Sequence, residues 1–162
     1  MTIRPATIDD AGAVAEIWYH GWRDAHLGHV PEALRAARTR ESFDTRAAHA
    51  VEKTAVATVD GAVAGFVMVV DDEVEQVYVS SAHRGSGIAA VLLAEAERRV
   101  AANGHDRAWL AVIAENPRAR RFYERNGWVD EGAFEHHAPS DDGPISVTAH
   151  RYVKRLAGGS PH

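Results

Sequence analysis

The sequence contains no cysteine among its 162 residues, so disulfide bonds, thiolate nucleophiles and cysteine-based zinc sites are excluded. Long apolar runs are missing as well. The longest, at residues 62–70, is far shorter than the roughly 20 residues that span a bilayer. The first residues also lack the basic-then-apolar pattern of a signal peptide. We therefore expect a cytoplasmic protein with no membrane partner.

Basic residues are fewer than acidic ones: the sequence has 18 Lys and Arg residues and 23 Asp and Glu residues, which give a formal net charge of -5. This balance argues against nonspecific nucleic-acid binding and is compatible with a cationic amine substrate. Histidines are plentiful, but His20, His26 and His29 match no familiar ligand spacing, and neither cysteine nor an acidic triad accompanies them. No metal site is predicted.

What remains is the composition of one ordinary globular domain, with 46% apolar and 25% charged residues. The sequence has no repeats, low-complexity segments or second-domain linker. We expect a single domain at residues 1–156, followed by a flexible tail at 157–162.

The spacing of apolar residues changes from helical to extended near residue 54. Asp60-Gly61 is a strong hairpin signal, and a second turn follows at Asp71-Asp72. A later strand–helix–strand unit implies a parallel pair. The expected elements, in order, are a strand at 3–5, a helix after residue 10, two short helices in 31–50, strands at 54–59, 62–70 and 73–79, a helix from 87, a buried strand at 107–113, a helix from 117 capped by Asn116 and ended by Gly127, and strands at 128–135 and 145–156.

Residues 77–93 run from an alternating apolar strand through a glycine-rich turn into an amphipathic helix. The first-turn N–H groups of a helix are unpaired and carry partial positive charge. Gly85 and Gly87 allow close approach of a ligand and positive φ, and Arg84 adds a phosphate-matching fork. A phosphate or pyrophosphate is the natural ligand. The alternative is a plain strand-to-helix turn in which Ser86 caps the helix.

Two motifs in this sequence resemble those of the GNAT superfamily of N-acetyltransferases. The first, Arg84-x-x-Gly87-x-Ala89, is similar to the superfamily's Arg/Gln-x-x-Gly-x-Gly/Ala signature, whose loop holds the pyrophosphate of acetyl-coenzyme A. The Walker and dinucleotide fingerprints do not fit this loop. The second resembles the superfamily's other hallmark and reads Asn116-x-x-Ala119-x-x-Phe122-Tyr123-x-x-x-Gly127-Trp128. The order of elements also resembles the superfamily from end to end.

The resemblance implies an α/β (α+β) fold with a mixed, mostly antiparallel sheet of about seven strands, a splayed central parallel pair and about four flanking helices. It implies an N-acetyltransferase in which a primary amine of a small molecule or peptide attacks acetyl-coenzyme A directly. No metal or nucleic acid takes part, and a homodimer is compatible with the sequence.

By the same resemblance, main-chain groups of Val77 and Val79 would pair with pantetheine and polarise the thioester carbonyl. Asn116 would contact the pantetheine arm, although a helix-capping role alone would also explain an asparagine there. The implied cofactor-binding residues are Val77, Tyr78, Val79, Arg84, Gly85, Ser86, Gly87, Ile88, Ala89, Asn116, Ala119, Phe122 and Tyr123.

Tyr123 would protonate the departing thiolate, because a phenol is protonated at neutral pH; the alternative is a core aromatic beside Phe122. Glu73 and Glu75 share a strand face and are the candidate bases, with Glu73 preferred. Both could instead be surface residues, with ordered water as the base. The acceptor pocket is expected between residues 22–31 and 136–144, with Trp22, His26 and Glu73 touching the substrate and His137, Asp141 and Asp142 as further candidates.

Two other functions compete with acetylation of an amine. One is a noncatalytic acyl-coenzyme A sensor, which would not need Tyr123. The other is a toxin-like module that acts on charged transfer RNA, and the net charge of -5 does not supply its basic surface. A longer acyl donor remains open as a variant of the first function.

Overall fold

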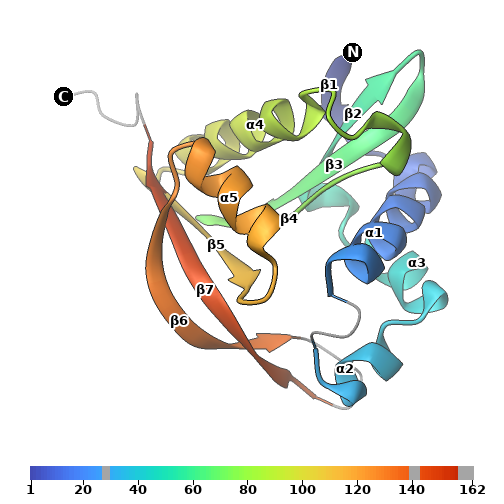
Figure 1. Ribbon diagram of the computed structural model, residues 1–162. Coiled ribbons are helices and arrows are strands. Elements are labelled where there is room, and N and C mark those ends of the chain that lie inside the picture. The colour runs from blue at the N-terminus through green and yellow to red at the C-terminus, as the bar shows by residue number, and fades with distance from the viewer. Residues whose placement is uncertain (27–29, 139–142, 157–162) are drawn as a thin grey trace.

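The computed structural model describes residues 1–26, 30–138 and 143–156. Within these ranges the chain forms one seven-stranded sheet in the order β1-β2-β3-β4-β5-β7-β6 (Figure 1). Neighbouring strands are antiparallel except for β4 and β5, which are parallel. The predicted mixed sheet is confirmed. Its strands are β1 (Thr2–Pro5), β2 (Thr54–Val59), β3 (Ala62–Val70), β4 (Glu73–Val79), β5 (Arg107–Ile113), β6 (Val129–Ala138) and β7 (Ile145–Arg155).

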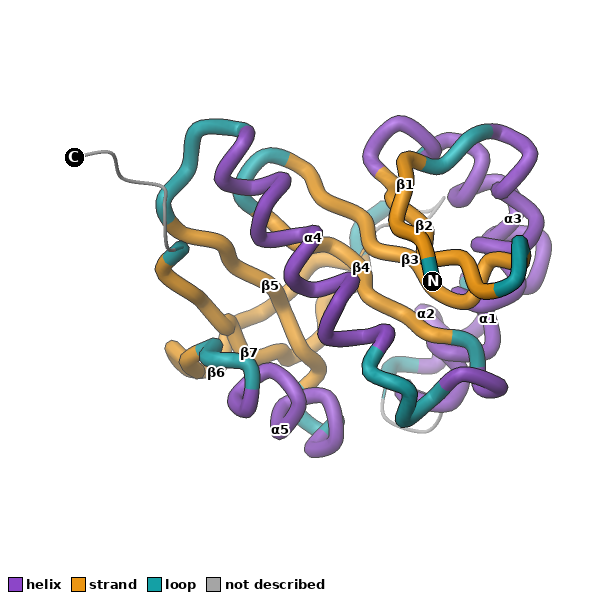
Figure 2. The backbone as a smooth tube through the Cα atoms, turned by 90° about the horizontal axis from the view of Figure 1, so that it is seen from above, coloured by secondary structure: helices purple, strands orange, loops and turns teal. Residues whose placement is uncertain are grey.

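Five α-helices, rather than about four, flank the sheet in the part of the chain that is described. They are α1 (Ala11–His26), α2 (Glu32–Ala37), α3 (Arg40–His49), α4 (Ile88–Ala102) and α5 (Pro117–Arg125). Helix α4 crosses the strands on one face, where Leu92 and Val67 belong to one buried cluster (Figure 2). Trp18 of α1 and Phe43 of α3 belong to a second cluster, which also contains Phe66 of β3. None of the described helices is long and apolar enough to cross a membrane.

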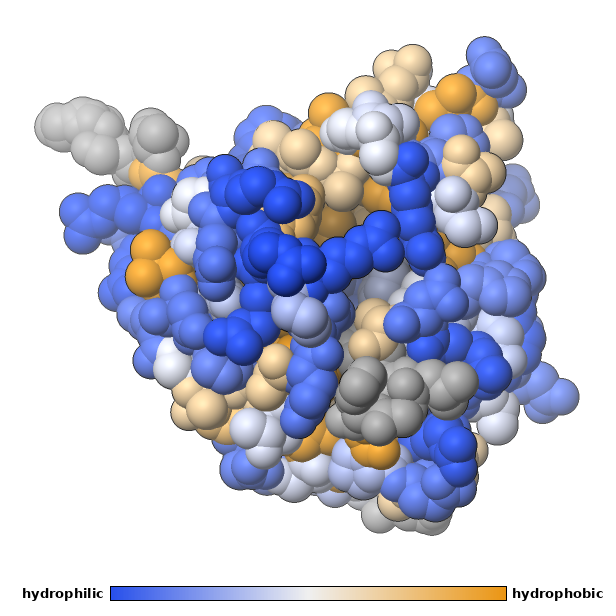
Figure 3. All heavy atoms as spheres, in the orientation of Figure 1, coloured by the Kyte–Doolittle hydropathy of each residue, from blue (hydrophilic) through white to orange (hydrophobic). Residues whose placement is uncertain are grey.

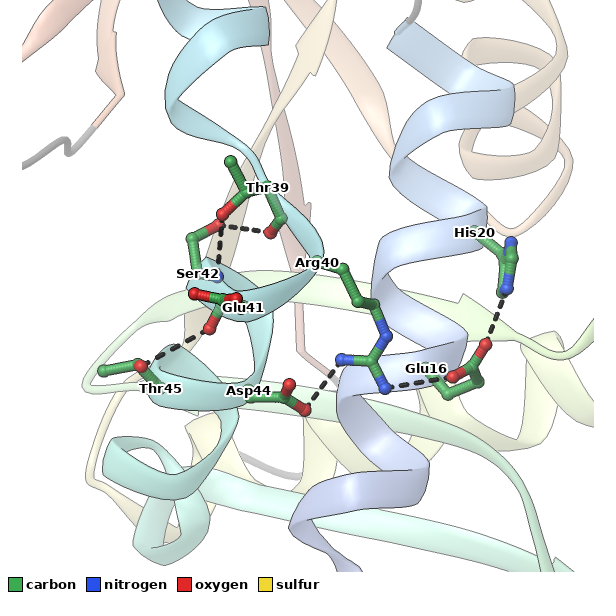
Figure 4. Close-up of polar contacts among 8 residues, drawn as sticks. All are labelled: Glu16, His20, Thr39, Arg40, Glu41, Ser42, Asp44 and Thr45. Atoms are coloured by element: carbon green, nitrogen blue, oxygen red, sulfur yellow. Dashed lines mark hydrogen bonds and ion pairs between the residues drawn. The ribbon is translucent and has the colours of Figure 1, made fainter.

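Helices α1 and α3 are also joined by a polar bridge on the surface. The Arg40 guanidinium contacts Asp44 one turn further along α3 at 2.7 Å and Glu16 of α1 at 2.9 Å (Figure 4). Thr39 begins α3 as its N-cap, since its hydroxyl oxygen accepts a hydrogen bond from the Ser42 N–H. Exposed ion pairs of this kind stabilise little, so the aromatic contacts beneath the bridge hold the helices together.

The turns follow the local signals in the sequence. Asp60 and Gly61 both have positive φ, at 53° and 83°, as a two-residue hairpin requires. Asn116 accepts a hydrogen bond from Ala119 N–H at 3.2 Å and begins α5, with Pro117 as its first residue. Gly127 follows α5 with a φ of 89°. The predicted start and stop of this helix are confirmed.

The start of the domain contains a pH-sensitive contact. Asp10, which is buried, accepts hydrogen bonds from Arg4 and from Thr7 N–H, and these lower the pKa of Asp10 to about 2. Since this pKa lies below the unfolded value, the contact stabilises the fold above about pH 4 and is lost as pH falls towards 2. Arg4 is partly exposed, so we expect Asp10→Asn to cost only about 1 kcal/mol at pH 7. Urea unfolding at pH 7 and pH 2.5 should show this cost becoming smaller in acid.

Candidate active site

The site begins where the two parallel strands separate. Strands β4 and β5 pair only at Glu73 and Trp109, and beyond that point they diverge (Figure 1). Ser80 N–H donates to Ala64 O of β3 at 2.8 Å. Because residues alternate along an antiparallel ladder, Tyr78 also turns its main chain to β3. The N–H and C=O groups of the residues on either side of Tyr78 therefore face the gap.

Those residues are Val77 and Val79, whose side chains pack against the core cluster beneath α4. The side chains are thus structural, as expected, while the main-chain edge faces β5. The main chain of Tyr78 is turned away, so only its side chain can reach a ligand. Its ring lies 5.9 Å from that of Phe66, and a Cβ at Gly21 would overlap it, so α1 holds the ring closely.

A cavity of about 560 Å³ occupies the gap and continues between the helices and β6 and β7. The face in Figure 3 is hollowed between the two halves of the molecule, with apolar residues in the upper part of the hollow and hydrophilic residues around it. Of the residues predicted for the site, those that line the cavity are Trp22, Glu73, Glu75, Val77, Tyr78, Asn116, Ala119, Tyr123 and His137.

Other predicted residues lie outside this lining. Val79, Phe122 and residues 84–89 are at the neighbouring gap and loop. His26 is the last residue of α1, and its side chain is outside the described structure. Asp141 and Asp142 also lie outside the described residues. Among the side chains predicted to touch the substrate, Trp22, Glu73 and His137 line the cavity.

The glycine loop ends at the N-terminus of α4. Gly85 and Gly87 have φ values of 80° and 87°, and a Cβ built at either meets nothing within 4 Å. The loop thus leaves open space for a ligand, and its glycines are required by backbone geometry rather than by crowding. Gly87 itself is the N-cap, and the Ser86 hydroxyl donates to His83 O instead. The alternative in which Ser86 caps the helix is wrong.

Arg84 already forms an ion pair at this loop. Its guanidinium contacts Asp24 of α1 at 2.7 Å, and the Arg84 side chain is 33% exposed. A bound pyrophosphate would compete with Asp24 for the same donors. Ile88 is buried in the core, so it and Ala89 offer a ligand their main-chain N–H groups rather than their side chains.

Tyr123 projects from α5 into the cavity. Its ring packs against Phe122, Trp128 and Tyr152, with centroids 5.3 to 6.2 Å apart. Burial raises the pKa of Tyr123 to about 12, so the phenol keeps its proton throughout the neutral range. None of the described residues forms a hydrogen bond with its hydroxyl. The residue is therefore both a packing group and an available donor.

Asn116 lies at the same end of the cavity. Its side-chain oxygen is committed to capping α5, while its amide N–H donors remain for another partner. The capping role is confirmed, and it leaves room for a second one.

The two glutamates come to the cavity through a β-bulge. Met68 opposes Gln76 and Val69 opposes Val74, so Glu75 is the extra residue in β4. Glu75 forms an ion pair with Lys53 at 2.5 Å. Glu73 has no such partner among the described residues, and burial, followed by repulsion from Glu75, raises its pKa to about 7.

Several cavity residues are absent from the predicted set. Arg38, Arg46 and His49 come from the segment predicted only as two short helices, and Lys53 is also new. An alternating or helical pattern says which face a residue occupies, but not which distant surface that face meets. No local signal in the sequence marks these residues as part of the cavity.

The sheet with one splayed parallel pair, the glycine loop at its edge and the tyrosine in the gap together match the arrangement that the two GNAT-like motifs imply. The acetyltransferase (GNAT) family model matches residues 14–128, and the chain belongs to this family.

Curated relatives agree with this assignment over part of the chain. An uncharacterized N-acetyltransferase from Mycobacterium tuberculosis is 33% identical over 78 residues, which cover 45% of this chain and 50% of the relative. The same values hold for an uncharacterized N-acetyltransferase from Mycobacterium bovis. The chain thus spans about half the length of the curated relatives it matches.

Solved structures share the fold over nearly the whole chain. A GCN5-related N-acetyltransferase from Rhodopseudomonas palustris has a TM-score of 0.74 at 20% identity, covering 96% of this chain and 95% of that one. The yncA protein from Salmonella typhimurium, solved with its cofactor acetyl-CoA, has a TM-score of 0.72 at 20% identity, covering 100% and 97%. PaiA N-acetyltransferase from Thermoplasma acidophilum, in complex with coenzyme A, has a TM-score of 0.70 at 20% identity, covering 96% and 98%.

Proposed function

We propose that this protein transfers an acetyl group from acetyl-coenzyme A to a primary amine of a small molecule or peptide. The observation that carries the proposal is the gap between β4 and β5, which joins the glycine loop to the Tyr123 hydroxyl along a free main-chain edge. The solved relatives that hold acetyl-CoA or coenzyme A support the choice of donor. We further propose that residues 1–156 act as one catalytic domain.

The residues present fit this donor. The N–H groups of the loop and of the first turn of α4 would bind its pyrophosphate, assisted by Arg84. Val77 and Val79 would hold the pantetheine arm through their main-chain groups, and the Asn116 amide would donate to it. When bound, acetyl-coenzyme A supplies the acyl group as a reactive thioester.

Two side chains would handle protons. Glu73, whose pKa of about 7 suits a base at neutral pH, would accept the proton of the incoming ammonium, through water where the distance requires it. Tyr123 would present its O–H to the departing sulfur. Since a thiol is a stronger acid than this phenol, the main effect of Tyr123 would be a hydrogen bond that stabilises the thiolate.

A noncatalytic sensor is the second candidate, because the loop and the gap would serve binding alone. The hydroxyl of Tyr123, which is unpaired among the described residues, and the raised pKa of Glu73 favour catalysis, since binding of the donor needs neither. A screen of coenzyme A release across amines, amino acids, antibiotics and peptide N-termini separates the two functions. A longer acyl donor is tested in the same screen by replacing acetyl-coenzyme A with its homologues.

The donor assignment is tested by Gly87→Val. Wild-type protein should melt at a higher temperature with acetyl-coenzyme A, because a ligand that binds only the folded state stabilises it. The variant should lose most of this shift, with affinity reduced at least about tenfold, because valine disfavours the positive φ that aims the loop N–H groups.

Gly104→Val is the matched control. Gly104 follows the other end of α4 with a φ of 95° and open space around it, so valine there causes similar strain far from the loop. This variant should melt lower but keep the full shift with acetyl-coenzyme A. An unchanged shift in Gly87→Val would remove the pyrophosphate assignment.

A further inference from the structure

The end of the cavity away from the glycine loop is lined by two arginines. Arg38 ends α2 and is 7% exposed, so it is almost fully buried. Arg46 of α3 stacks its guanidinium 4.3 Å from the ring centre of Trp18. Both residues line the same cavity as Glu73 and Tyr123. Arg46 is only partly buried as a residue, but part of its guanidinium is shielded from solvent, and a shielded charge is costly unless something compensates it.

Arg46 is the more unusual of the two. Its Nη1 atom is shielded from solvent and has no hydrogen-bond partner among the residues that the structure describes. No described carboxylate lies within ion-pair distance of it. Burial, and then the charge of Arg38, lower the pKa of Arg46 to about 10, so the group stays charged at neutral pH. The protein thus maintains a cation without a carboxylate partner of its own.

The acidic residues of the cavity do not fill this role. Glu75 is committed to Lys53. Glu73, with a pKa raised to about 7, is only partly ionised at neutral pH. His136 cannot supply negative charge in either protonation state, and burial lowers its pKa. The arginine end of the cavity therefore favours an anion, and a guanidinium fork matches the two oxygens of a carboxylate.

The other residues that line the cavity indicate the chemical character of the rest of the ligand. Trp22, Leu34 and Val147 line the cavity and are buried, so the space beside the arginines is apolar. The Tyr78 hydroxyl interacts electrostatically with Arg38 and Arg46 and also with Tyr123, so it lies between the two ends of the cavity. The arginine end is therefore adjacent to the end where the amine would react.

From this arrangement we infer that the acceptor carries a carboxylate as well as its amine, and that Arg46, with Arg38, binds this carboxylate. The substrate class is an amino acid with an apolar side chain, or a close analogue. This inference rests on the proposed function, since it assigns the acceptor of the same site. It adds a negatively charged group to the amine substrate with which the net charge was compatible.

The test compares matched acceptors. Leucine, methionine and phenylalanine are assayed for coenzyme A release beside their carboxamides, which keep the amine and side chain but lose the negative charge. In wild type the acids should have the higher kcat/KM. In Arg46→Met that advantage should fall by about 10- to 100-fold, mainly through KM, because a charge-assisted hydrogen bond is lost. Rates with the carboxamides should change little.

Arg35→Met is the control, because Arg35 is exposed on α2 and, among the described residues, forms an ion pair only with Glu32. It should leave both series of acceptors unchanged. Arg46→Met should melt at the same or a higher temperature, since methionine keeps the contact with Trp18 and removes a buried charge. Wild type that prefers the carboxamides, or equal losses for both series in Arg46→Met, would overturn the inference.

Binding separates this inference from the proposed function. With coenzyme A present, calorimetry should detect tighter binding of N-acetyl-phenylalanine, N-acetyl-leucine or N-acetyl-methionine than of the corresponding amides, and Arg46→Met should remove the difference. This readout needs no turnover, so it decides the anion site even if no amine is acetylated. Equal binding of acids and amides overturns the carboxylate assignment, whereas failure of coenzyme A to bind overturns the donor instead.

Discussion

Replacing Tyr123 with phenylalanine is expected to lower kcat by roughly 10²- to 10⁴-fold, the range typical of a lost proton donor. The substitution keeps the ring and its contacts with Phe122 and Trp128, so the fold and the affinity for acetyl-coenzyme A should hardly change. What disappears is the hydroxyl, which forms no hydrogen bond with the described residues. Single-turnover measurements of coenzyme A release at saturating substrates would measure the effect on chemistry.

Tyr19→Phe is the matched control, because Tyr19 packs on Phe43 in α1 and does not line the cavity. It should keep the wild-type rate. Since the pKa of Tyr123 is raised to about 12, the wild-type rate should show no loss from tyrosine ionisation up to pH 9.5. A decrease of less than about threefold in Tyr123→Phe, with chemistry rate-limiting, would reduce Tyr123 to a packing residue.

Glu73→Gln is expected to lower kcat/KM by about 10²- to 10³-fold below pH 7. A carboxylate whose pKa is about 7 is a much stronger base than water. It can therefore take the proton from an ammonium group whose pKa is near 10. The wild-type rate should rise with pH and level off above about pH 7, when Glu73 is ionised. The variant should keep rising towards the pKa of the amine, so the difference between the two shrinks with pH. Profiles from pH 6 to 9.5 would measure this.

The groups that surround Glu73 make Glu75→Gln the natural comparison. Glu75 and Asp72 raise the pKa of Glu73, while Lys53 and Arg151 lower it. Removing the charge of Glu75 should therefore lower the pKa of Glu73 and move the wild-type plateau to more acidic pH without abolishing it. Identical profiles for wild type and both variants would mean that neither glutamate acts as the base and that water takes this role.

Much of the fold could be predicted because its signals are local. The hairpin at Asp60-Gly61 and the start of α5 at Asn116 depend on residues only a few positions apart. The glycine loop and its position before α4 were predictable for the same reason. Ser86 shows the limit even here, because serine can satisfy a neighbouring carbonyl as easily as it can cap a helix.

The arrangement of the site was less predictable because it depends on register and on distant contacts. The bulge at Glu75 appears only when β4 is paired with β3, and it brings two consecutive residues to the same side. Arg46 looks like any charged residue of a short helix until α3 is packed beside the cavity. The net charge of the whole chain is negative, so it does not reveal the local excess of positive charge at Arg38 and Arg46.

The separation of β4 from β5 has a further consequence for how the sheet is completed. An unpaired strand edge on a protein surface invites other chains to add to it, which is a route to aggregation. Here the unpaired edge of Val77 and Val79 lies in the interior of a seven-stranded sheet rather than at its outer edge. A slender ligand with amide groups of its own would fill that place by the chemistry of strand addition, which peptide-binding domains use at their outer edges. Under the proposed function, acetyl-coenzyme A would take the place that a neighbouring strand holds elsewhere in the sheet.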